Sequence, residues 1–173
     1  MAKAVDRTLW EAQLREWGRA VGDAAVSGEI PLPLVVALRG SLGTGKSVLA
    51  RAVARGAGVV GPMPSPTYNL LFTYEGADGV ALHHLDLYRL EDRDDVWELG
   101  WQELGEGREI VLIEWPERAE SLLPPDRWDV RLAFPDDEAG AAGPGADGAG
   151  LRTVRVERRG AAPEPPPLPE GDG

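Results

Sequence analysis

The stretch LVVALRGSLGTGKSVLARAVARGAG, residues 34–58, decides the fold. It opens with a short apolar, β-branched run that is typical of a buried strand. From residue 47 onward, apolar side chains recur at helical spacing until a glycine ends the pattern, which predicts a helix. Between them lies GSLGTGKS, residues 40–47, which matches the phosphate-binding pattern GxxxxGK(S/T) without a gap. A strand, a glycine-rich loop and a helix in direct succession predict a nucleotide-binding site.

Each part of this loop has a physical task. Gly40, Gly43 and Gly45 let the backbone curl so that successive amide N–H groups point inward at phosphate oxygens. The helix that follows adds the positive end of its dipole. Lys46 is one of only two lysines in the chain, and we expect it to bridge the β and γ phosphates. We expect the Ser47 hydroxyl to bind magnesium.

A phosphate loop also needs an acid that holds the metal or its water shell, at the tip of a neighbouring strand. Two apolar runs contain a suitable carboxylate: VALHHLDLY has Asp86, and EIVLIEW has Glu114. The unbroken apolar run at 110–113 favours Glu114, because central parallel strands have this pattern. Asp86 lies between two leucines, where an acid without a partner is unfavourable. Both stay candidates, and a surface or capping role stays open for each.

The remaining signals predict an α/β fold of three layers. Thr8 and Glu11 have capping-box spacing, and apolar residues recur every three or four positions, which predicts a helix from about Leu9 to Val26. Further strands are predicted at 68–74, 80–88 and 110–114, with helical turns at 92–104. Residues 128–134 and 151–156 predict a C-terminal β-hairpin. We therefore expect a P-loop NTPase fold with a mixed, largely parallel central sheet.

Glycine and proline are concentrated after residue 135 and predict less regular structure there. Residues 135–150 contain little to bury and predict a flexible loop within the hairpin. Residues 160–173, GAAPEPPPLPEGDG, predict a disordered, partly polyproline tail. We expect residues 1–159 to form a single domain, because its length fits one.

Three further features carry weaker signals. His83 and His84 are adjacent and would face opposite sides of a strand, so they cannot act as a pair, and structural or surface roles are favoured. For Trp115, stacking on a base, covering the site and simple packing all stay open. A basic cluster near the end of the chain consists of Arg152, Arg155, Arg158 and Arg159. We interpret it as a solvated strand face, although RNA backbone contact is plausible only there.

The composition excludes several classes of protein. The 18 basic and 29 acidic residues leave a formal charge of −11, which disfavours unaided nucleic-acid binding. The absence of cysteine excludes disulfides, thiolate zinc sites and a cysteine nucleophile. No apolar run approaches the ~18 residues of a membrane span, and the first residues do not have a signal-peptide pattern. We therefore expect a soluble, cytoplasmic protein.

Taken together, the motifs resemble those of the bacterial TsaE (YjeE) ATPase family. The resemblance rests on the phosphate loop and on SPTYNLLFTYE at 65–75, LHHLDLYRL at 82–90 and LIEWPER at 112–118. These strings stand in the family's order and spacing over roughly residues 17–134. SPTY, HLDLYRL and IEWPE together are highly specific.

The resemblance implies a small ATPase that uses ATP and Mg²⁺. It implies work with the partner proteins TsaB and TsaD, which form N6-threonylcarbamoyladenosine (t6A) beside the anticodon of tRNA and make most of the RNA contact. The residues implied to wrap the phosphates are Gly43, Thr44, Gly45, Lys46, Ser47 and Val48.

The resemblance also implies roles at the reacting phosphate. Asp86 and Glu114 would lie at the metal and the water, with Ser47 as a further metal ligand, and Lys46 would complete the catalytic set. For Glu114 we expect a metal role first and a water-positioning role second. Thr67 of SPTY falls where a switch-like loop could sense the γ-phosphate.

This chain departs from the family in two respects, and other functions stay open. Ser41 stands where the family usually has aspartate, and neither residues 135–150 nor the tail after Gly160 has a family counterpart. No arginine finger is evident in cis, so hydrolysis by the chain alone should be slow. The alternatives are a small P-loop kinase and a nucleotide-dependent binding module. A GTPase is disfavoured because no NKxD string is present.

Overall fold

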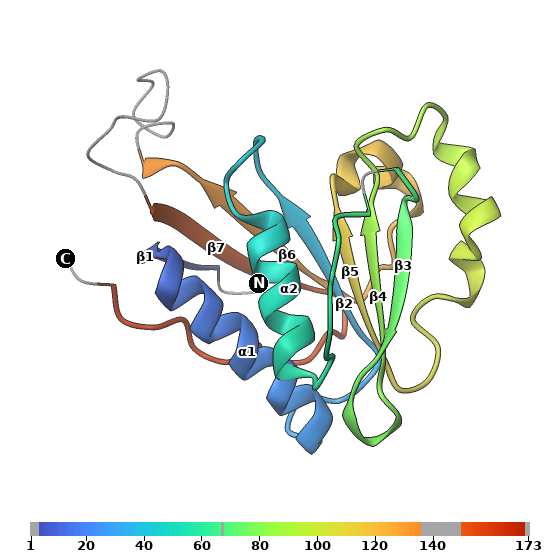
Figure 1. The fold of residues 1–173 in the computed structure, drawn as a ribbon. Helices are drawn as coiled ribbons and strands as arrows, with labels where there is room; N and C mark the ends of the chain where they lie inside the picture. Colours follow the sequence, from blue (N-terminus) through green and yellow to red (C-terminus); the bar gives the residue numbers. More distant parts are fainter. Residues whose placement is uncertain (1–3, 67, 136–149, 172–173) are drawn as a thin grey trace.

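The structure is a computed structural model that describes residues 4–66, 68–135 and 150–171. Over these residues, seven strands form one sheet in the order β1-β7-β6-β2-β5-β4-β3 (Figure 1). The strands are β1 (Val5–Trp10), β2 (Leu34–Arg39), β3 (Leu71–Glu75), β4 (Ala81–Asp86), β5 (Glu109–Glu114), β6 (Arg127–Ala133) and β7 (Leu151–Arg159). The β2 strand pairs in parallel with both β5 and β6, and β4 pairs in parallel with β5. The outer pairings are antiparallel, so the sheet is mixed as expected, with its parallel part at the centre.

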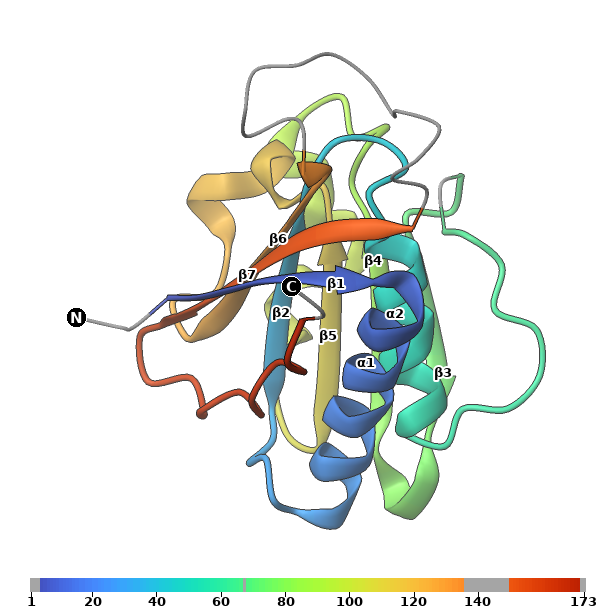
Figure 2. The ribbon, with the colours of Figure 1, turned by 90° about the vertical axis from the view of Figure 1, so that its left-hand side faces the viewer.

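Helices cover both faces of this sheet. On one face lie α1 (Glu11–Ser27) and α2 (Lys46–Gly56), and on the other lies the 3-10 helix η4 (Pro116–Leu122) (Figure 2). The remaining 3-10 helices are η1 (Ala77–Gly79), η2 (Arg93–Leu99) and η3 (Trp101–Glu103). Two apolar clusters result, one under α1 and α2 and one under η2, η3 and η4. The predicted three-layer α/β fold is confirmed.

The N-terminus differs from the expected helix at 9–26. Residues 5–10 form β1, which pairs with β7 and places Thr8 opposite Thr153, so Thr8 cannot cap a helix. Instead α1 begins at Glu11, and the Gln13 side chain accepts a hydrogen bond of 2.8 Å from the Trp10 backbone N–H. The expectation failed because β7 offers an unpaired edge that the local pattern of residues 5–10 does not reveal.

The other expected elements are present with somewhat different bounds. The β3 strand begins at Leu71 rather than at residue 68, and β4 ends at Asp86. The predicted helical turns are η2 and η3. The β6 and β7 strands form the predicted antiparallel hairpin. Residues 136–149, which make up most of the loop predicted at 135–150, lie outside the described residues.

The expectation of disorder was wrong for residues 160–171, which pack against the core as an irregular segment. Ala162 and Leu168 are buried. The indole N–H of Trp17 donates to the Pro166 carbonyl at 3.1 Å, and that of Trp128 donates to the Pro163 carbonyl at 2.7 Å. Prolines keep their carbonyl acceptors although they lack an N–H, so this segment can satisfy both buried indoles.

Replacing Leu168 with alanine should lower the free energy of unfolding by about 2 kcal/mol, because a buried side chain is lost and a cavity remains. Urea denaturation measures the change. The matched control is Pro167→Ala in the same segment, because Pro167 is exposed and its replacement should change stability little. Equal, negligible effects of the two substitutions would contradict the packing of the segment.

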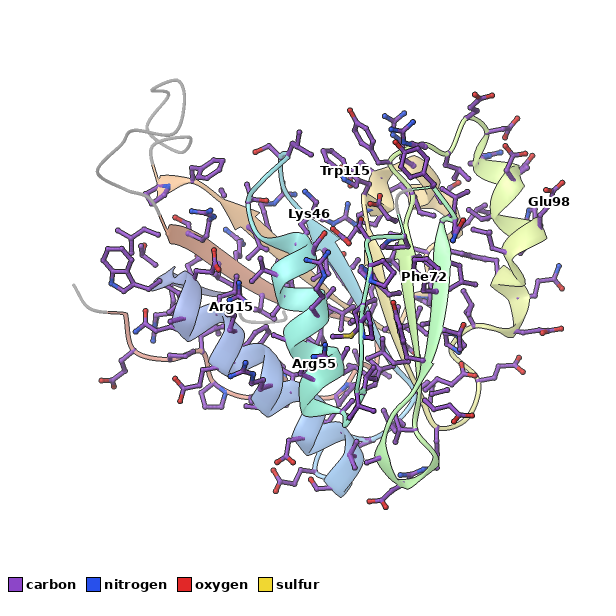
Figure 3. The ribbon with its side chains drawn as sticks, viewed as in Figure 1. Arg15, Lys46, Arg55, Phe72, Glu98 and Trp115 are labelled. Atoms are coloured by element: carbon purple, nitrogen blue, oxygen red, sulfur yellow. The ribbon has the colours of Figure 1, made fainter. Side chains whose placement is uncertain are left out.

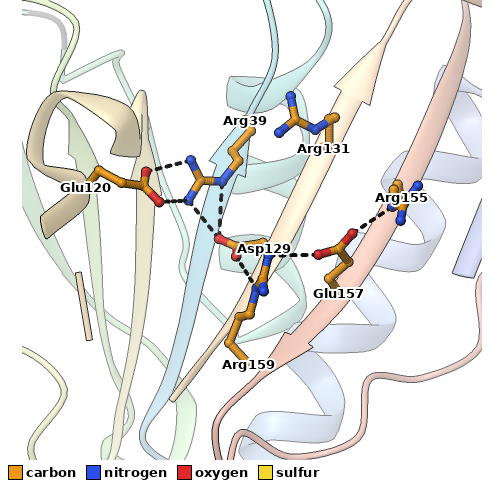
Figure 4. Close-up of a pocket in the computed structure, with 7 residues that line it drawn as sticks. All are labelled: Arg39, Glu120, Asp129, Arg131, Arg155, Glu157 and Arg159. Atoms are coloured by element: carbon orange, nitrogen blue, oxygen red, sulfur yellow. Dashed lines mark hydrogen bonds and ion pairs between the residues drawn. The ribbon is translucent and has the colours of Figure 1, made fainter. Parts of the chain in front are cut away.

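A charged network on the open face of β6 and β7 fixes the end of β2 (Figure 4). Asp129 is 6% exposed and accepts hydrogen bonds from Arg39, Arg127 and Arg159. Arg39 also donates twice to Glu120 of η4, at 2.7 and 3.0 Å. Because Arg39 directly precedes Gly40, the network holds the start of the glycine-rich loop against β6 and η4.

Contacts with arginines favour the ionised form of Asp129. Burial by itself would raise the pKa of the Asp129 carboxyl, but hydrogen bonds from Arg127 and Arg39 outweigh it and lower that pKa. A carboxyl whose pKa is lowered on folding stabilises the fold above its unfolded pKa of ~3.9. This contribution is lost as the pH falls through the lower, folded-state pKa.

Asp129→Asn should therefore lower the free energy of unfolding at neutral pH by about 3 kcal/mol, since several arginines lose their buried counter-charge. The difference from the wild type should shrink below pH ~4, because the carboxyl is protonated first in the unfolded chain and then, at its lower pKa, in the folded protein. Denaturation at several pH values measures both effects. Glu164→Gln is the control, because Glu164 is 81% exposed and pairs only with Arg158 among the described residues. If the difference in the free energy of unfolding did not change with pH, the charge of Asp129 would not be the source of the stabilisation.

Candidate functional site

The candidate site lies at the edge of the sheet where three parallel strands end. The register places Leu38 of β2 and Asp86 of β4 opposite Glu114 of β5. The glycine-rich loop connects β2 directly to the first residue of α2, Lys46. Open α/β sheets bind ligands at the carboxyl ends of their strands, and the N-terminus of a helix attracts anions.

The loop's backbone requires glycine. Gly40, Gly43 and Gly45 have φ values of 148°, 80° and 107°, which side chains disfavour. A Cβ added to Gly40 would also lie 2.3 Å from the Leu132 carbonyl oxygen. The loop therefore curls closely over β6 in a conformation that the sequence pattern had predicted.

Lys46 lies within the curl of the loop and is 4% exposed. Its Nζ donates to the carbonyls of Gly40 at 2.7 Å and Ser41 at 2.8 Å. The ammonium group also lies 4.2 Å from the centre of the Trp115 ring, and Figure 3 shows both residues at the same end of the sheet. Burial lowers the pKa of Lys46, while the neighbouring Glu114, Glu117 and Asp86 act against that shift.

Glu114 joins three elements of the site. Its carboxylate is 2% exposed and accepts hydrogen bonds from the Ser47 hydroxyl, at 2.8 and 3.1 Å to its two oxygens. The Nε2 atom of His84 lies 2.6 Å from Oε2 of the same carboxylate. A buried carboxylate needs such partners, and here they come from α2 and β4.

Asp86 is the second buried acid of the site and is 6% exposed. Its Oδ1 accepts the Tyr88 backbone N–H at 3.0 Å. Within the described ranges, no group of three or more His, Cys, Asp or Glu could by itself hold a metal ion. The oxygens of Ser47, Glu114 and Asp86 nevertheless suit Mg²⁺, which usually takes few protein ligands and completes its shell with water and phosphate.

A cavity of about 270 Å³ brings most of the predicted site residues together. Its lining includes the predicted residues Gly43, Gly45, Lys46, Ser47, Val48, Asp86 and Glu114. Gly40 and Thr44 belong to the same loop, and the Thr44 hydroxyl donates to the Ser41 carbonyl at 2.8 Å. Thr67 lies outside the described residues.

Three residues have a larger part in the site than their sequence signals suggested. His84 contacts Glu114, whereas His83 lies near Thr73 and Glu109, so the two histidines do face opposite ways. Because side chains alternate along a strand, the two-residue spacing of His84 and Asp86 could have placed His84 at the site. The second is Trp115, which has a φ of 55° and packs against the Tyr88 ring, with 4.9 Å between the ring centres and an angle of 50° between the planes.

The third residue is Arg152 of β7, which lines the same cavity and donates to the carbonyls of Thr44 and Gly43. We had interpreted it as part of a solvated strand face together with Arg155, Arg158 and Arg159. That interpretation holds for the other three arginines, whose side chains are 41–53% exposed and pair with acidic residues in the described part of the chain. No local pattern shows that Arg152 reaches the loop, because more than a hundred residues separate the two.

The fold and the site together define a P-loop protein of the nucleotide-binding class. Residues 9–140 match the family model described as threonylcarbamoyl adenosine biosynthesis protein TsaE. This match covers more than half of the chain, and the chain belongs to the TsaE family.

Individual relatives agree with this assignment. The chain is 38% identical over 108 residues to the tRNA threonylcarbamoyladenosine biosynthesis protein TsaE of Treponema pallidum, covering 62% of this chain and 75% of that protein. It is 32% identical over 127 residues to the protein of the same name from Haemophilus influenzae, covering 73% and 80%. The crystal structure of Bacillus subtilis YdiB has the same fold, with a TM-score of 0.60, 22% identity, and coverage of 92% of this chain and 88% of that one.

Among the residues that the structure describes, no helix is both long enough and apolar enough to cross a bilayer.

Proposed function

We propose that this chain is a Mg²⁺-dependent ATPase that serves t6A formation on tRNA in the cytoplasm, together with TsaB and TsaD. One observation carries the proposal: a single cavity at the phosphate loop is lined by Lys46, Ser47, Asp86 and Glu114. Membership of the TsaE family supports the pathway, since the relatives are named for biosynthesis of this modified nucleoside.

The residues present fit a bound nucleoside triphosphate. Backbone N–H groups of the loop would donate to the phosphates, and Lys46 would exchange its bonds to Gly40 and Ser41 for bonds to phosphate oxygens. These carbonyls hold the ammonium group close to where the phosphates would lie, so little rearrangement is needed. The absence of an NKxD string favours adenine over guanine.

Ser47, Glu114 and Asp86 would hold Mg²⁺ directly or through its water shell. Bound Mg²⁺ supplies charge neutralisation at the β and γ phosphates. The Ser47 hydroxyl, which now donates to Glu114, would turn its lone pair to the metal and keep the carboxylate nearby. Beyond its metal role, Glu114 would orient water, with His84 limiting its movement. Thr67 would sense the γ-phosphate.

Hydrolysis by the chain alone should be slow, on the order of 10⁻⁴ to 10⁻² per second, as in P-loop proteins without an activating arginine. Arg152 does not fill that role, because its donors bind backbone carbonyls. We therefore propose that TsaB and TsaD stimulate turnover. The overall charge of −11 fits a protein that leaves most tRNA contact to these partners.

Replacing Lys46 with alanine should weaken ATP binding by roughly a hundredfold or more, because charge-assisted bonds to the phosphates are lost. It should also abolish turnover and complementation of a t6A-deficient strain. Titration calorimetry measures the binding. Arg19→Ala is the control, since Arg19 is an exposed cation of α1. Unchanged binding by Lys46→Ala would remove the basis of the proposal.

Glu114→Gln separates the metal role from nucleotide binding. The substitution keeps the size of the side chain but removes its charge, so Mg²⁺ should no longer strengthen ATP binding. Hydrolysis should fall by roughly a hundredfold. Calorimetric titrations with and without Mg²⁺ measure the effect, with Glu98→Gln on η2 as an exposed control. A magnesium effect as large as that of the wild type would argue against a metal role for Glu114.

A further inference from the structure

Arg152 connects the C-terminal hairpin to the phosphate loop. Its Nε donates to the Thr44 carbonyl at 2.9 Å, and its Nη2 donates to the Gly43 carbonyl at 3.3 Å. The guanidinium carbon lies 4.6 Å from the centre of the ring of Phe134, the residue that directly follows β6. Arg152 is half-buried and lines the cavity that holds Lys46.

This arginine lies outside residues 9–140, the part of the chain that matches the family model. Its backbone is nevertheless held in the sheet, because β7 pairs with β1 at Arg152 itself and with β6 from the next residue, Thr153, onward. In the β1 ladder Arg152 stands opposite Leu9, which is fully buried. The side chain therefore reaches the loop from a rigid support.

The two carbonyls that Arg152 binds determine how the loop's amides point. In a trans peptide the C=O and N–H bonds point in opposite directions. The carbonyls of Gly43 and Thr44 belong to the peptides whose N–H groups are those of Thr44 and Gly45. Holding both carbonyls on the side of β7 therefore turns these two N–H groups away from it. The Thr44 N–H now makes a long hydrogen bond of 3.4 Å to the Ser41 carbonyl, which a phosphate oxygen would replace.

We propose that Arg152 is a positioning residue that holds the phosphate loop in its nucleotide-binding form through the carbonyls of Gly43 and Thr44. This inference rests on the proposed function, because it assigns Arg152 a part in nucleotide binding. Arginine is suited to the task, since its planar fork donates to two separate acceptors at once. A lysine would carry the same charge, but all its hydrogen-bond donors lie on a single nitrogen.

The test is titration calorimetry of ADP and ATP with the full chain carrying Arg152→Ala or Arg152→Lys. Both variants should bind each nucleotide about tenfold more weakly than the wild type, because neither can hold two carbonyls. Arg158→Ala is the matched control on the same strand, since Arg158 pairs with Glu164 and should leave affinity unchanged. Thermal unfolding without nucleotide reports on stability separately.

Wild-type affinity in Arg152→Ala, even with a lowered melting temperature, would overturn the inference and leave Arg152 a purely structural residue. Wild-type affinity in Arg152→Lys would also overturn it, because charge alone would then suffice. Should Arg152→Ala not fold, the lysine variant decides. Lys46→Ala, titrated in parallel, separates the two claims. If it binds normally, the proposed function fails, and if only Arg152→Ala binds normally, the inference alone fails.

Discussion

The buried carboxylate of Glu114 is the constraint on which the site depends. At 2% exposure it cannot rely on water, so its hydrogen bonds must come from the protein. Ser47 provides them from the first turn of α2, and His84 lies within bonding distance from β4. These contacts hold the helix that follows the loop and two central strands in one arrangement. Lys46 and Asp86 are thereby kept beside the same cavity.

The fold around this point is largely local in origin, and much of it could be predicted from the sequence. Strand β2, the glycine-rich loop and α2 follow one another directly, so residues 34–56 specify their own arrangement. The apolar run of β5 ends at Glu114, and parallel pairing brings it level with Asp86. Each of these features depends on spacing within a short segment, which a sequence displays directly.

The features that the sequence did not reveal depend on distant contacts. The β1 strand exists because β7 offers it an edge, although its own residues had favoured the start of a helix. The proline-rich segment is ordered because Trp17 and Trp128 donate to its carbonyls. Arg152 reaches a loop more than a hundred residues away. Composition and periodicity carry no information on such distant pairings, so the expectations failed at these three places.

The central claim is that ATP used at this loop supports t6A formation, and a reconstituted modification assay tests it most directly. Unmodified tRNA is incubated with TsaB, TsaD, the substrates of the modification and ATP, with or without this protein, and t6A is measured by mass spectrometry. We expect sustained formation of t6A only when this protein is present. Equal yields of t6A in its absence would contradict the claim.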